Sequence, residues 1–392
     1  MDDYKKRIAI LKRFLILLVC VFFLSACTME SDELEQNEES IVLSGSFLQS
    51  WACRDWSRER WEYEFAAMKE LGMEYLILQS VYDLMMSTES ASKQDWQSYT
   101  VNSQYSLYPT NIEGLQGAIL GGVNDGDVLE YALSAAKETG MQVYIGLISD
   151  NRWWNYGWGS PELIVEKKDT ATESYFATWC EYNGKLNGQM ITEIWERYGQ
   201  EYGDQIAGWY YYNEIWNIDA GCKKQDNGAY SICLGNNINY MLDAINESCP
   251  EKPMMLSPFY NQTISTALQY KDFWIDIFEV ADFRVGDIFA PQDSVGANKV
   301  SIEDLGEWIG CLKKAADTES GLRFWVNNEC FNEDYTPAEV SRFIEQMEAT
   351  SQYAEKHITF SWNHYYNPLY DVSYTSYNEE LKEYLEKELQ TK

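Results

Sequence analysis

Short runs rich in apolar, β-branched and aromatic residues alternate with longer segments of helical periodicity from Leu43 to the end of the chain. We count eight such runs, at residues 43–49, 75–81, 142–148, 206–212, 253–259, 285–290, 323–328 and 357–362. Helical candidates lie between and after them, at about residues 57–71, 128–139, 172–202, 231–248, 263–280, 301–316, 337–355 and 378–388. This alternation is typical of βα units around a parallel sheet. Eight units predict an α/β fold, a single (β/α)8 TIM barrel over residues 43–392.

A doubly wound open sheet is the main alternative. Such folds usually carry a phosphate-binding loop after a strand, and neither GxGxxG nor a Walker pattern follows any of the eight runs. We therefore favour the barrel and expect no cofactor. No repeat and no Pro/Gly/Ser-rich linker divides the domain, and we expect it to be monomeric.

The first residues have the layout of an export signal. A basic cluster that includes Lys12 and Arg13 precedes an apolar run over residues 14–24, which is shorter than the roughly 20 residues of a membrane-spanning helix. The run ends in Leu-Ser-Ala-Cys27, which resembles the bacterial lipobox. That resemblance implies cleavage of a signal peptide, residues 1–26, and a diacylglycerol anchor on Cys27 in the cell membrane, facing the extracytoplasmic side.

An acidic segment follows the proposed anchor. Residues 28–40 contain six acidic side chains and no aromatic residue, so this stretch cannot bury enough apolar surface to fold. We interpret residues 27–42 as a tether.

Composition excludes several classes of function. The formal net charge of −32 disfavours nucleic acid as a partner, because phosphate binding needs a basic face. The two histidines, His357 and His364, exclude HExxH zinc chemistry and disfavour a histidine-based nucleophile triad. Asp125-Gly126-Asp127 could offer oxygen ligands to calcium, but a solvated turn is the favoured interpretation, and we expect no metal.

The cysteines beyond the signal and anchor show no CxxC spacing. We interpret them as buried or free thiols. Cys222 and Cys233 flank a polar segment and form the candidate pair for a disulfide.

Two long connections follow the second and third predicted strands, at residues 82–127 and 149–171. Loops of this length in a compact domain are usually functional. Both are rich in aromatic residues: Trp96, Tyr99, Tyr105, Tyr108, Trp153, Trp154, Tyr156 and Trp158. These rings either pack the loops onto the barrel or form a sugar-stacking cleft, since flat aromatic faces cover the apolar side of a pyranose.

Glutamates close two of the predicted strands. The fourth ends in Tyr212-Asn213-Glu214 and the seventh in Asn327-Asn328-Glu329, so both acids are expected at the carboxyl-terminal mouth of the barrel. Two carboxylates on opposite sides of a bound bond are what glycoside hydrolysis requires. Chance is the alternative, because 62 of the 392 residues are acidic.

At these positions the chain resembles the large clan of retaining β-glycosidases with TIM barrels. The resemblance implies that Glu214 is the acid/base and Glu329 the nucleophile, with Asn213 and Asn328 beside them. It also implies that Trp362, on strand eight, lies under the reactive sugar. The arginine common near strand two of that clan is missing, and Gln79-Ser80 stand in its place.

The segments Gly45 to Trp51 and Tyr75 to Gln79 resemble a bacterial TIM-barrel family of unknown function, DUF4434, which is grouped with the glycoside hydrolase barrels. Gln49, Trp51 and Gln79 would face the same mouth and hydrogen-bond sugar hydroxyls. Trp153, Trp154 and Tyr212 are further candidates for substrate binding. Alternatively, the two glutamines form a polar layer inside the barrel. Asp150, Asn261 and Asp293 also follow strands and are weaker candidates.

Three hypotheses follow. The first is a membrane-anchored glycosidase, with retention favoured, that acts on an extracellular oligosaccharide or polysaccharide. The second is a carbohydrate-binding lipoprotein on a barrel that no longer catalyses. The third, a solute-binding lipoprotein with two lobes, is disfavoured by the regular alternation.

Overall fold

The computed structural model describes residues 41–87, 95–122, 126–154, 175–217 and 229–390. The proposed signal peptide, Cys27 and nearly all of the acidic tether lie outside this range. Residues 41–392 form one compact unit. No helix in the described ranges is long and apolar enough to cross a bilayer.

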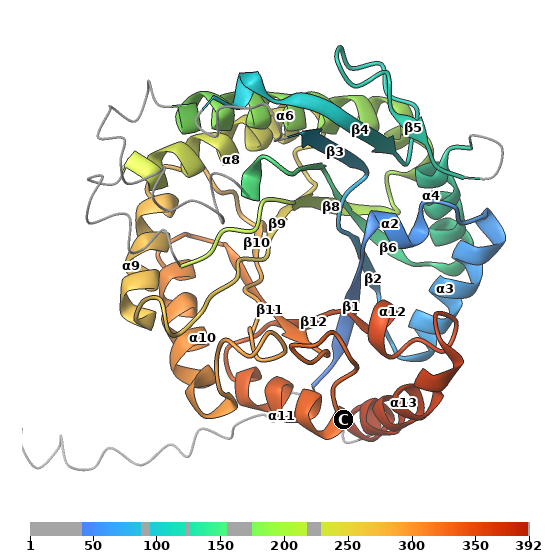
Figure 1. Ribbon diagram of the computed structural model, residues 1–392. Helices are drawn as coiled ribbons and strands as arrows, with labels where there is room; N and C mark the ends of the chain where they lie inside the picture. The colour runs from blue at the N-terminus through green and yellow to red at the C-terminus, as the bar shows by residue number, and fades with distance from the viewer. Residues whose placement is uncertain (1–40, 88–94, 123–125, 155–174, 218–228, 391–392) are drawn as a thin grey trace, which may run out of the picture. The chain divides into compact units, whose positions relative to one another are not determined.

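Eight parallel strands close into a barrel in the order β1-β12-β11-β10-β9-β8-β6-β2 (Figure 1). The strands are β1 (Leu43–Leu48), β2 (Tyr75–Leu78), β6 (Gln142–Gly146), β8 (Ile206–Tyr211), β9 (Met254–Leu256), β10 (Ile288–Phe289), β11 (Arg323–Glu329) and β12 (Lys356–Phe360). The predicted TIM barrel is confirmed. The fifth and eighth strands end earlier than predicted, at Leu256 and Phe360.

Helices surround the barrel as an outer ring (Figure 1). The long ones are α3 (Arg58–Glu70), α4 (Val128–Thr139), α6 (Tyr175–Tyr202), α8 (Ala229–Ser248), α9 (Ala267–Phe278), α10 (Ile302–Ala316), α11 (Val340–Thr350) and α13 (Thr375–Gln390). Short helical turns, α2 (Ser50–Cys53) and α12 (Trp362–Tyr365), follow β1 and β12. In α3, the Ser57 side chain caps the first turn by accepting from Arg60 N, while Trp61 and Phe65 are buried.

Successive side chains along each strand point alternately into the barrel and toward the helices, so the core has two layers. The barrel interior holds Phe47, Ile77, Tyr144, Tyr210, Met255, Ile288, Trp325 and Ile358. Alternate residues such as Leu48, Trp209 and Val326 belong to the second layer, between strands and helices. The same alternation decides which residues at the strand ends reach the mouth.

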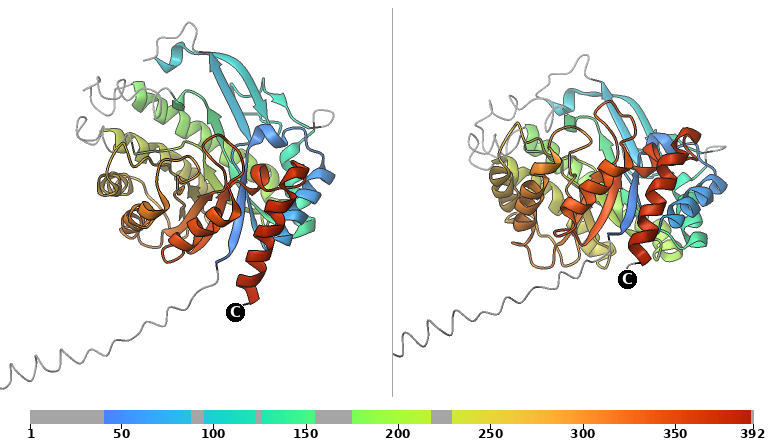
Figure 2. Two further views of the ribbon diagram at one scale, coloured as in Figure 1. Left: turned by 60° about the horizontal axis from the view of Figure 1, so that its bottom comes forward. Right: turned by 90° about the horizontal axis from the view of Figure 1, so that it is seen from below.

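A second sheet is built from three strands of the long connection after β2 and one strand of the connection after β6. It has the order β5-β4-β3-β7, with β3 (Tyr82–Ser87), β4 (Thr100–Ser106), β5 (Ile119–Leu120) and β7 (Ile148–Asp150). The sheet stands at the end of the barrel where the strands terminate (Figure 2). The connection after β2, predicted only as a long loop, therefore contributes three strands beside the mouth.

Candidate functional site

Glu329 closes β11 and lies at the mouth. It continues the inward positions of Trp325 and Asn327, and its side chain is buried. The backbone N–H of Ala297 donates to its Oε2 at 2.7 Å. Burial raises the pKa of Glu329, as do the negative charges of Asp293 and Glu214. Each of these effects opposes ionisation of the Glu329 carboxyl.

Glu214 follows β8 with the same inward parity as Tyr210 and Tyr212. Its Oε1 accepts a hydrogen bond from Gln292 Nε2 at 2.7 Å, and Gln292 also donates to Ser257 O at 3.1 Å. Glu214 is partly exposed. Both predicted catalytic glutamates lie at the carboxyl ends of parallel barrel strands with inward parity, so the structure places them at the same mouth.

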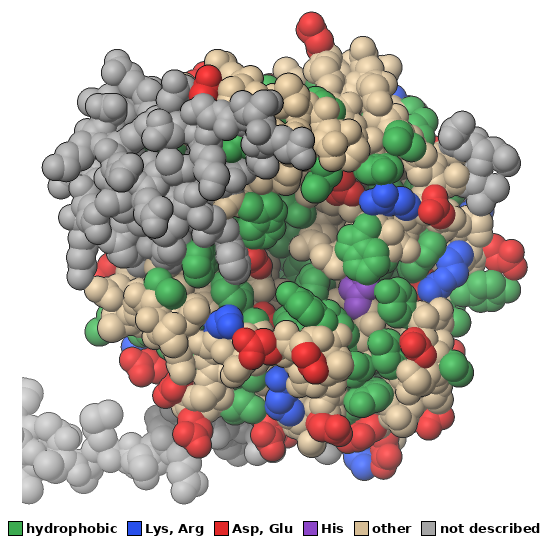
Figure 3. All heavy atoms as spheres, viewed as in Figure 1, with side chains coloured by type: hydrophobic (Ala, Val, Ile, Leu, Met, Phe, Trp, Pro, Cys, Tyr) green, Lys and Arg blue, Asp and Glu red, His purple; other side chains and the backbone are tan. Residues whose placement is uncertain are grey.

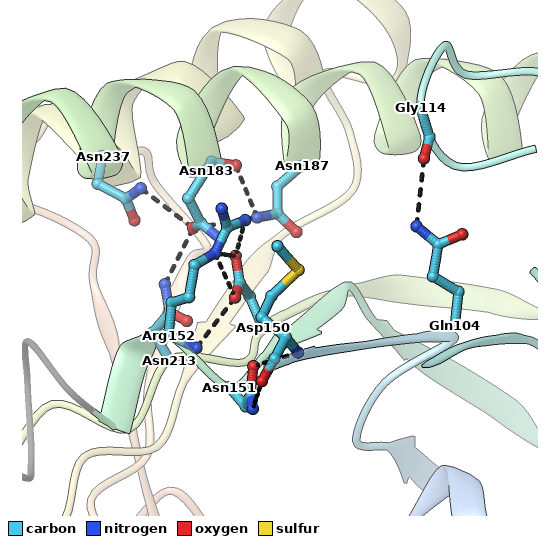
Figure 4. A network of polar contacts seen from close by, with 10 residues as sticks. Gln104, Gly114, Asp150, Asn151, Arg152, Asn183, Asn187, Asn213 and Asn237 are labelled. Carbon is cyan, nitrogen blue, oxygen red and sulfur yellow. Dashed lines mark hydrogen bonds and ion pairs between the residues drawn. The ribbon is translucent and has the colours of Figure 1, made fainter. Parts of the chain in front are cut away.

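Asn213, next to Glu214, faces helix α6 rather than the mouth. Its Nδ2 donates to Asn183 Oδ1 at 3.1 Å and to the Tyr211 hydroxyl at 3.4 Å. Asn187 and Asn237 donate to the same Asn183 oxygen (Figure 4). The substrate-binding role predicted for Asn213 therefore does not fit this geometry, because alternation along the chain turns it outward. It acts instead to fix the backbone before Glu214.

Asn328 is also turned away from the mouth and is fully buried. Its Nδ2 donates to Asp293 Oδ2 at 3.0 Å, and its Oδ1 lies 2.8 Å from Nδ1 of His357. The predicted substrate-binding role of Asn328 therefore does not fit this geometry, again because of alternation along the strand. Asn328 instead joins β11 to β12.

Trp362 is not on the eighth strand, contrary to the prediction. It begins α12, is fully buried and donates from Nε1 to Asn378 Oδ1 of α13 at 2.9 Å. The aromatic residue that reaches the mouth is Phe360, which pairs with Glu329 in register and contacts Phe47 with ring centroids 5.9 Å apart. The sequence prediction was therefore displaced by two residues.

Gln49 and Gln79 follow β1 and β2 with the inward parity of Phe47 and Ile77, and both are partly exposed. Within the described part of the chain, neither side chain has a hydrogen-bond partner, so both are available to a ligand. Trp51 in α2 is 51% exposed and stacks on His364. All three predicted positions remain candidates for substrate binding.

Of the aromatic residues near Glu214, some are buried in the core and others are exposed to solvent. Trp153 is fully buried and donates from Nε1 to Glu214 O at 3.2 Å, so it supports the acid rather than lining a cleft. Trp154 is 38% exposed. Burial raises the pKa of Tyr212 to about 12, opposed by a hydrogen bond with Ser149, so Tyr212 carries a proton at neutral pH.

The aromatic residues of the long connections mostly pack these segments onto the barrel. Trp96, Tyr99 and Tyr108 are buried. The guanidinium of Arg152 lies 5.2 Å from the ring of Trp96 and pairs with Asp150 at 2.6 Å. For these rings the packing interpretation holds. Tyr156 and Trp158 lie outside the described residues.

Asp83, on β3, is a polar residue of the mouth that the sequence did not single out. Its carboxylate accepts from Ser50 Oγ at 2.8 Å and Ser80 Oγ at 2.9 Å, with Arg54 at 3.7 Å. Burial raises its pKa. Asp83 closes the mouth where β1 and β2 end, near the place of the missing arginine.

Three of the weaker sequence candidates have structural partners. Asp150 holds Arg152, Asn261 accepts from Thr263 N at 2.9 Å, and Asp293 accepts from Gln346 Nε2 at 2.6 Å. Burial raises the pKa of Asp293, and its hydrogen bonds oppose that rise. Gln292 and Ala297, which contact the two glutamates, lie in the irregular segment after β10. Only their place after a strand could have marked them.

No group of His, Cys, Asp and Glu suited to a metal ion occurs among the residues that the structure describes. Asp127 caps α4 by accepting from Glu130 N at 2.9 Å. Cys53, Cys180, Cys249, Cys311 and Cys330 are buried free thiols. Cys222 lies outside the described residues, so its pairing with Cys233 stays a prediction.

Comparison with solved structures finds the same barrel fold in other proteins. A candidate α-L-fucosidase from Bacteroides thetaiotaomicron VPI-5482 aligns with a TM-score of 0.61 at 21% identity, over 91% of this chain and 97% of that one. A β-galactosidase from the psychrophilic Marinomonas ef1 aligns at 0.48 and 13% identity, over 88% of this chain and 59% of that one. The first likeness establishes the fold, and the second is too weak to add to it.

The chain belongs to the DUF4434 family, a domain of unknown function, whose match spans residues 43–370. No curated protein sequence matches the chain. The family relationship predicted from the first two strands is confirmed.

Proposed function

We propose that this protein is a glycoside hydrolase that cleaves an oligosaccharide or polysaccharide with Glu214 and Glu329. The observation that carries the proposal is the meeting of these two carboxyl groups at one barrel mouth, each held by a defined donor: Gln292 for Glu214 and the Ala297 N–H for Glu329. Two positioned carboxyl groups supply the proton and the nucleophile, or the activated water, that glycosidic cleavage needs.

Glu214 is the proposed acid/base and Glu329 the proposed nucleophile of a retaining mechanism. The Ala297 N–H is oriented to stabilise negative charge on Glu329 Oε2. Tyr212, protonated next to Glu214, can donate to a sugar hydroxyl. Gln49 and Gln79 offer further amide groups across the mouth.

A second candidate function is carbohydrate binding without catalysis. It is favoured by the buried setting of Glu329, whose pKa is raised by burial and by Asp293. A carboxyl that keeps its proton would be a poor nucleophile but can still donate a hydrogen bond to a sugar.

The proposed location is the outer face of the cell membrane, through a lipid on Cys27. Cys27→Ser should abolish incorporation of radiolabelled fatty acid and move the protein out of the detergent phase. Detergent partitioning as strong as that of the unchanged protein would contradict the anchor.

The experiment that tests the function is a screen of the protein against a panel of glycans, with release of reducing ends as the readout. Glu214→Gln and Glu329→Gln serve as matched variants that keep the side-chain shape. We expect cleavage by the unchanged protein and loss of cleavage in both variants. Saccharide binding without cleavage in the unchanged protein would favour the second candidate.

A further inference from the structure

Aromatic residues follow three neighbouring strands on one side of the mouth. In barrel order these strands are β1, β12 and β11. Trp51 lies in α2 after β1, Phe360 ends β12, and Tyr335 lies in the loop after β11. Because neighbouring strands are about 4.8 Å apart, the three rings are spread along the rim rather than gathered at one point. Figure 3 shows hydrophobic side chains around the central hollow on this face.

The three rings are linked by continuous contacts. Trp51 stacks on His364 with centroids 5.3 Å apart and an interplanar angle of 18°, and His364 lies 6.3 Å from Phe360. On the other side, Phe360 contacts Phe331 at 6.0 Å, and Phe331 stacks on Tyr335 at 6.1 Å and 10°. Phe360 is therefore the centre of an aromatic strip, and Trp51 and Tyr335 are its ends.

The ends of the strip are open to solvent, whereas the residues behind them are buried. Trp51 is 51% and Tyr335 is 74% exposed, but His364 and Phe331 are buried. Each end ring stacks on a buried partner and still keeps half or more of its side-chain surface exposed. Flat, exposed aromatic faces of this kind pack against the apolar face of a sugar ring.

The backbone at Tyr335 has a conformation that is unfavourable for its side chain. Its φ is +62°, a left-handed conformation that is costly for a bulky side chain. The turn is held by the bond from Tyr335 N to Asn332 O at 2.7 Å and by a bridge between Phe331 and Pro337. A strained backbone that places an aromatic ring in solvent gains little for folding, because the ring buries little area.

The strip is fixed relative to Glu329. Glu333, in the same loop as Tyr335, accepts from Asn298 Nδ2 at 2.9 Å and Lys299 Nζ at 3.1 Å. These two residues follow Ala297, whose N–H binds Glu329. The loop that carries Tyr335 is thus tied to the segment that positions the proposed nucleophile.

We propose that Trp51, Phe360 and Tyr335 form an elongated saccharide-binding strip, and that the substrate is a linear chain of sugars lying across the ends of β1, β12 and β11. This inference rests on the proposed function and specifies its substrate. A single terminal sugar would need only Phe360 and the two glutamates. Exposed rings on both sides of Phe360 are accounted for by a chain that extends in both directions from the reacting bond.

The test measures affinity against chain length. To prevent cleavage during the titration, every protein, including the otherwise unchanged one, carries Glu329→Gln. Each full-length protein is titrated by calorimetry with linear α- and β-linked homo-oligosaccharides, from disaccharides to hexasaccharides. The variants are Trp51→Ala and Tyr335→Asn, since asparagine tolerates the left-handed backbone, with Tyr335→Phe to retain the ring. Tyr63→Ala is the matched control, because Tyr63 is 58% exposed on helix α3.

We expect affinity of the unchanged protein to rise with chain length. Trp51→Ala and Tyr335→Asn should each weaken hexasaccharide binding about three- to tenfold, the scale of one aromatic contact, and leave disaccharide binding unchanged. Tyr335→Phe and Tyr63→Ala should bind as the unchanged protein does. The strip would be overturned if affinity did not depend on chain length, or if both ring-removal variants kept the length dependence. Neither result would contradict the proposed hydrolase function. Failure to bind or cleave any member of the panel would overturn both.

Discussion

The side-chain amide of Gln292 donates to Oε1 of Glu214 at 2.7 Å, which links the segment after β10 to the acid that follows β8. A second bond, from the same amide to Ser257 O at 3.1 Å, fixes the orientation of Gln292. Glu214 is thus positioned by a residue two strands away in the barrel. The chemistry of Glu214 therefore depends on packing between β8, β9 and β10.

Gln292→Leu should lower kcat on the order of tenfold to a hundredfold, because a misplaced acid loses its alignment with the reacting bond. KM and the thermal unfolding midpoint should change little. The measurement is steady-state kinetics on a substrate from the glycan screen. Gln104→Leu is the control, since it removes an exposed hydrogen bond from the side-chain amide of Gln104, on β4, to Gly114 O. Equal kcat in Gln292→Leu and Gln104→Leu would show that Gln292 does not position Glu214.

Trp362→Ala should destabilise the fold by about 3–5 kcal/mol, the usual cost of removing a fully buried large aromatic side chain. It also removes the bond to Asn378 that holds α13. Phe360→Ala should instead weaken saccharide binding, because Phe360 lies beside Glu329. Urea unfolding and calorimetry on both variants separate the two effects. A Trp362→Ala protein of normal stability that no longer binds sugar would restore the sequence interpretation of Trp362.

Trp362 and Phe360 show one limit of prediction from the sequence, since Phe360 and not Trp362 lies beside Glu329. The eight β-rich runs predicted the barrel, because short continuous apolar runs are typical of parallel strands that are buried on both faces. The ends of these runs also predicted that Glu214 and Glu329 lie at the mouth, because the carboxyl ends of parallel barrel strands meet there. The sequence did not show where β12 ends. Phe360 and Trp362 would point to the same side of a continued strand, and the resemblance favoured the tryptophan.

Other features could not be predicted from the sequence, for different physical reasons. The strand β4 is largely polar and exposed, so nothing in its sequence marked it as part of a sheet. Asn213 and Asn328 lie next to the glutamates in sequence but point to the helices, which follows from strict alternation once the strand ends are known. Gln292 and Ala297 contact the glutamates across long sequence separations, and only the closed barrel brings them there.

Low pH should destabilise the protein through His357. Burial lowers the pKa of His357 to about 4, against about 6.5 in an unfolded chain, so between these values the unfolded state binds more protons. Stability should therefore fall as pH drops from about 6.5 to about 4, with a contribution of up to about 3 kcal/mol from this residue. Urea unfolding of the unchanged protein and of His357→Gln across this range measures the difference. If the free energies of unfolding of the two proteins changed with pH in the same way, His357 would not be a source of the loss of stability at low pH.

The division of labour between the two glutamates can be tested by chemical rescue. Glu214→Ala should lose most activity on substrates with poor leaving groups but retain much more on an activated aryl glycoside, because that leaving group needs little protonation. Added azide should then restore turnover and give a glycosyl azide of retained configuration, since azide attacks the glycosyl-enzyme in place of activated water. Glu329→Ala should be inactive on both substrates, because the intermediate cannot form. Azide should rescue it only with inverted configuration, as seen by proton NMR of the product. A Glu329→Ala protein rescued with retention would reverse the two roles, and one that keeps full activity would favour binding without catalysis by Glu329.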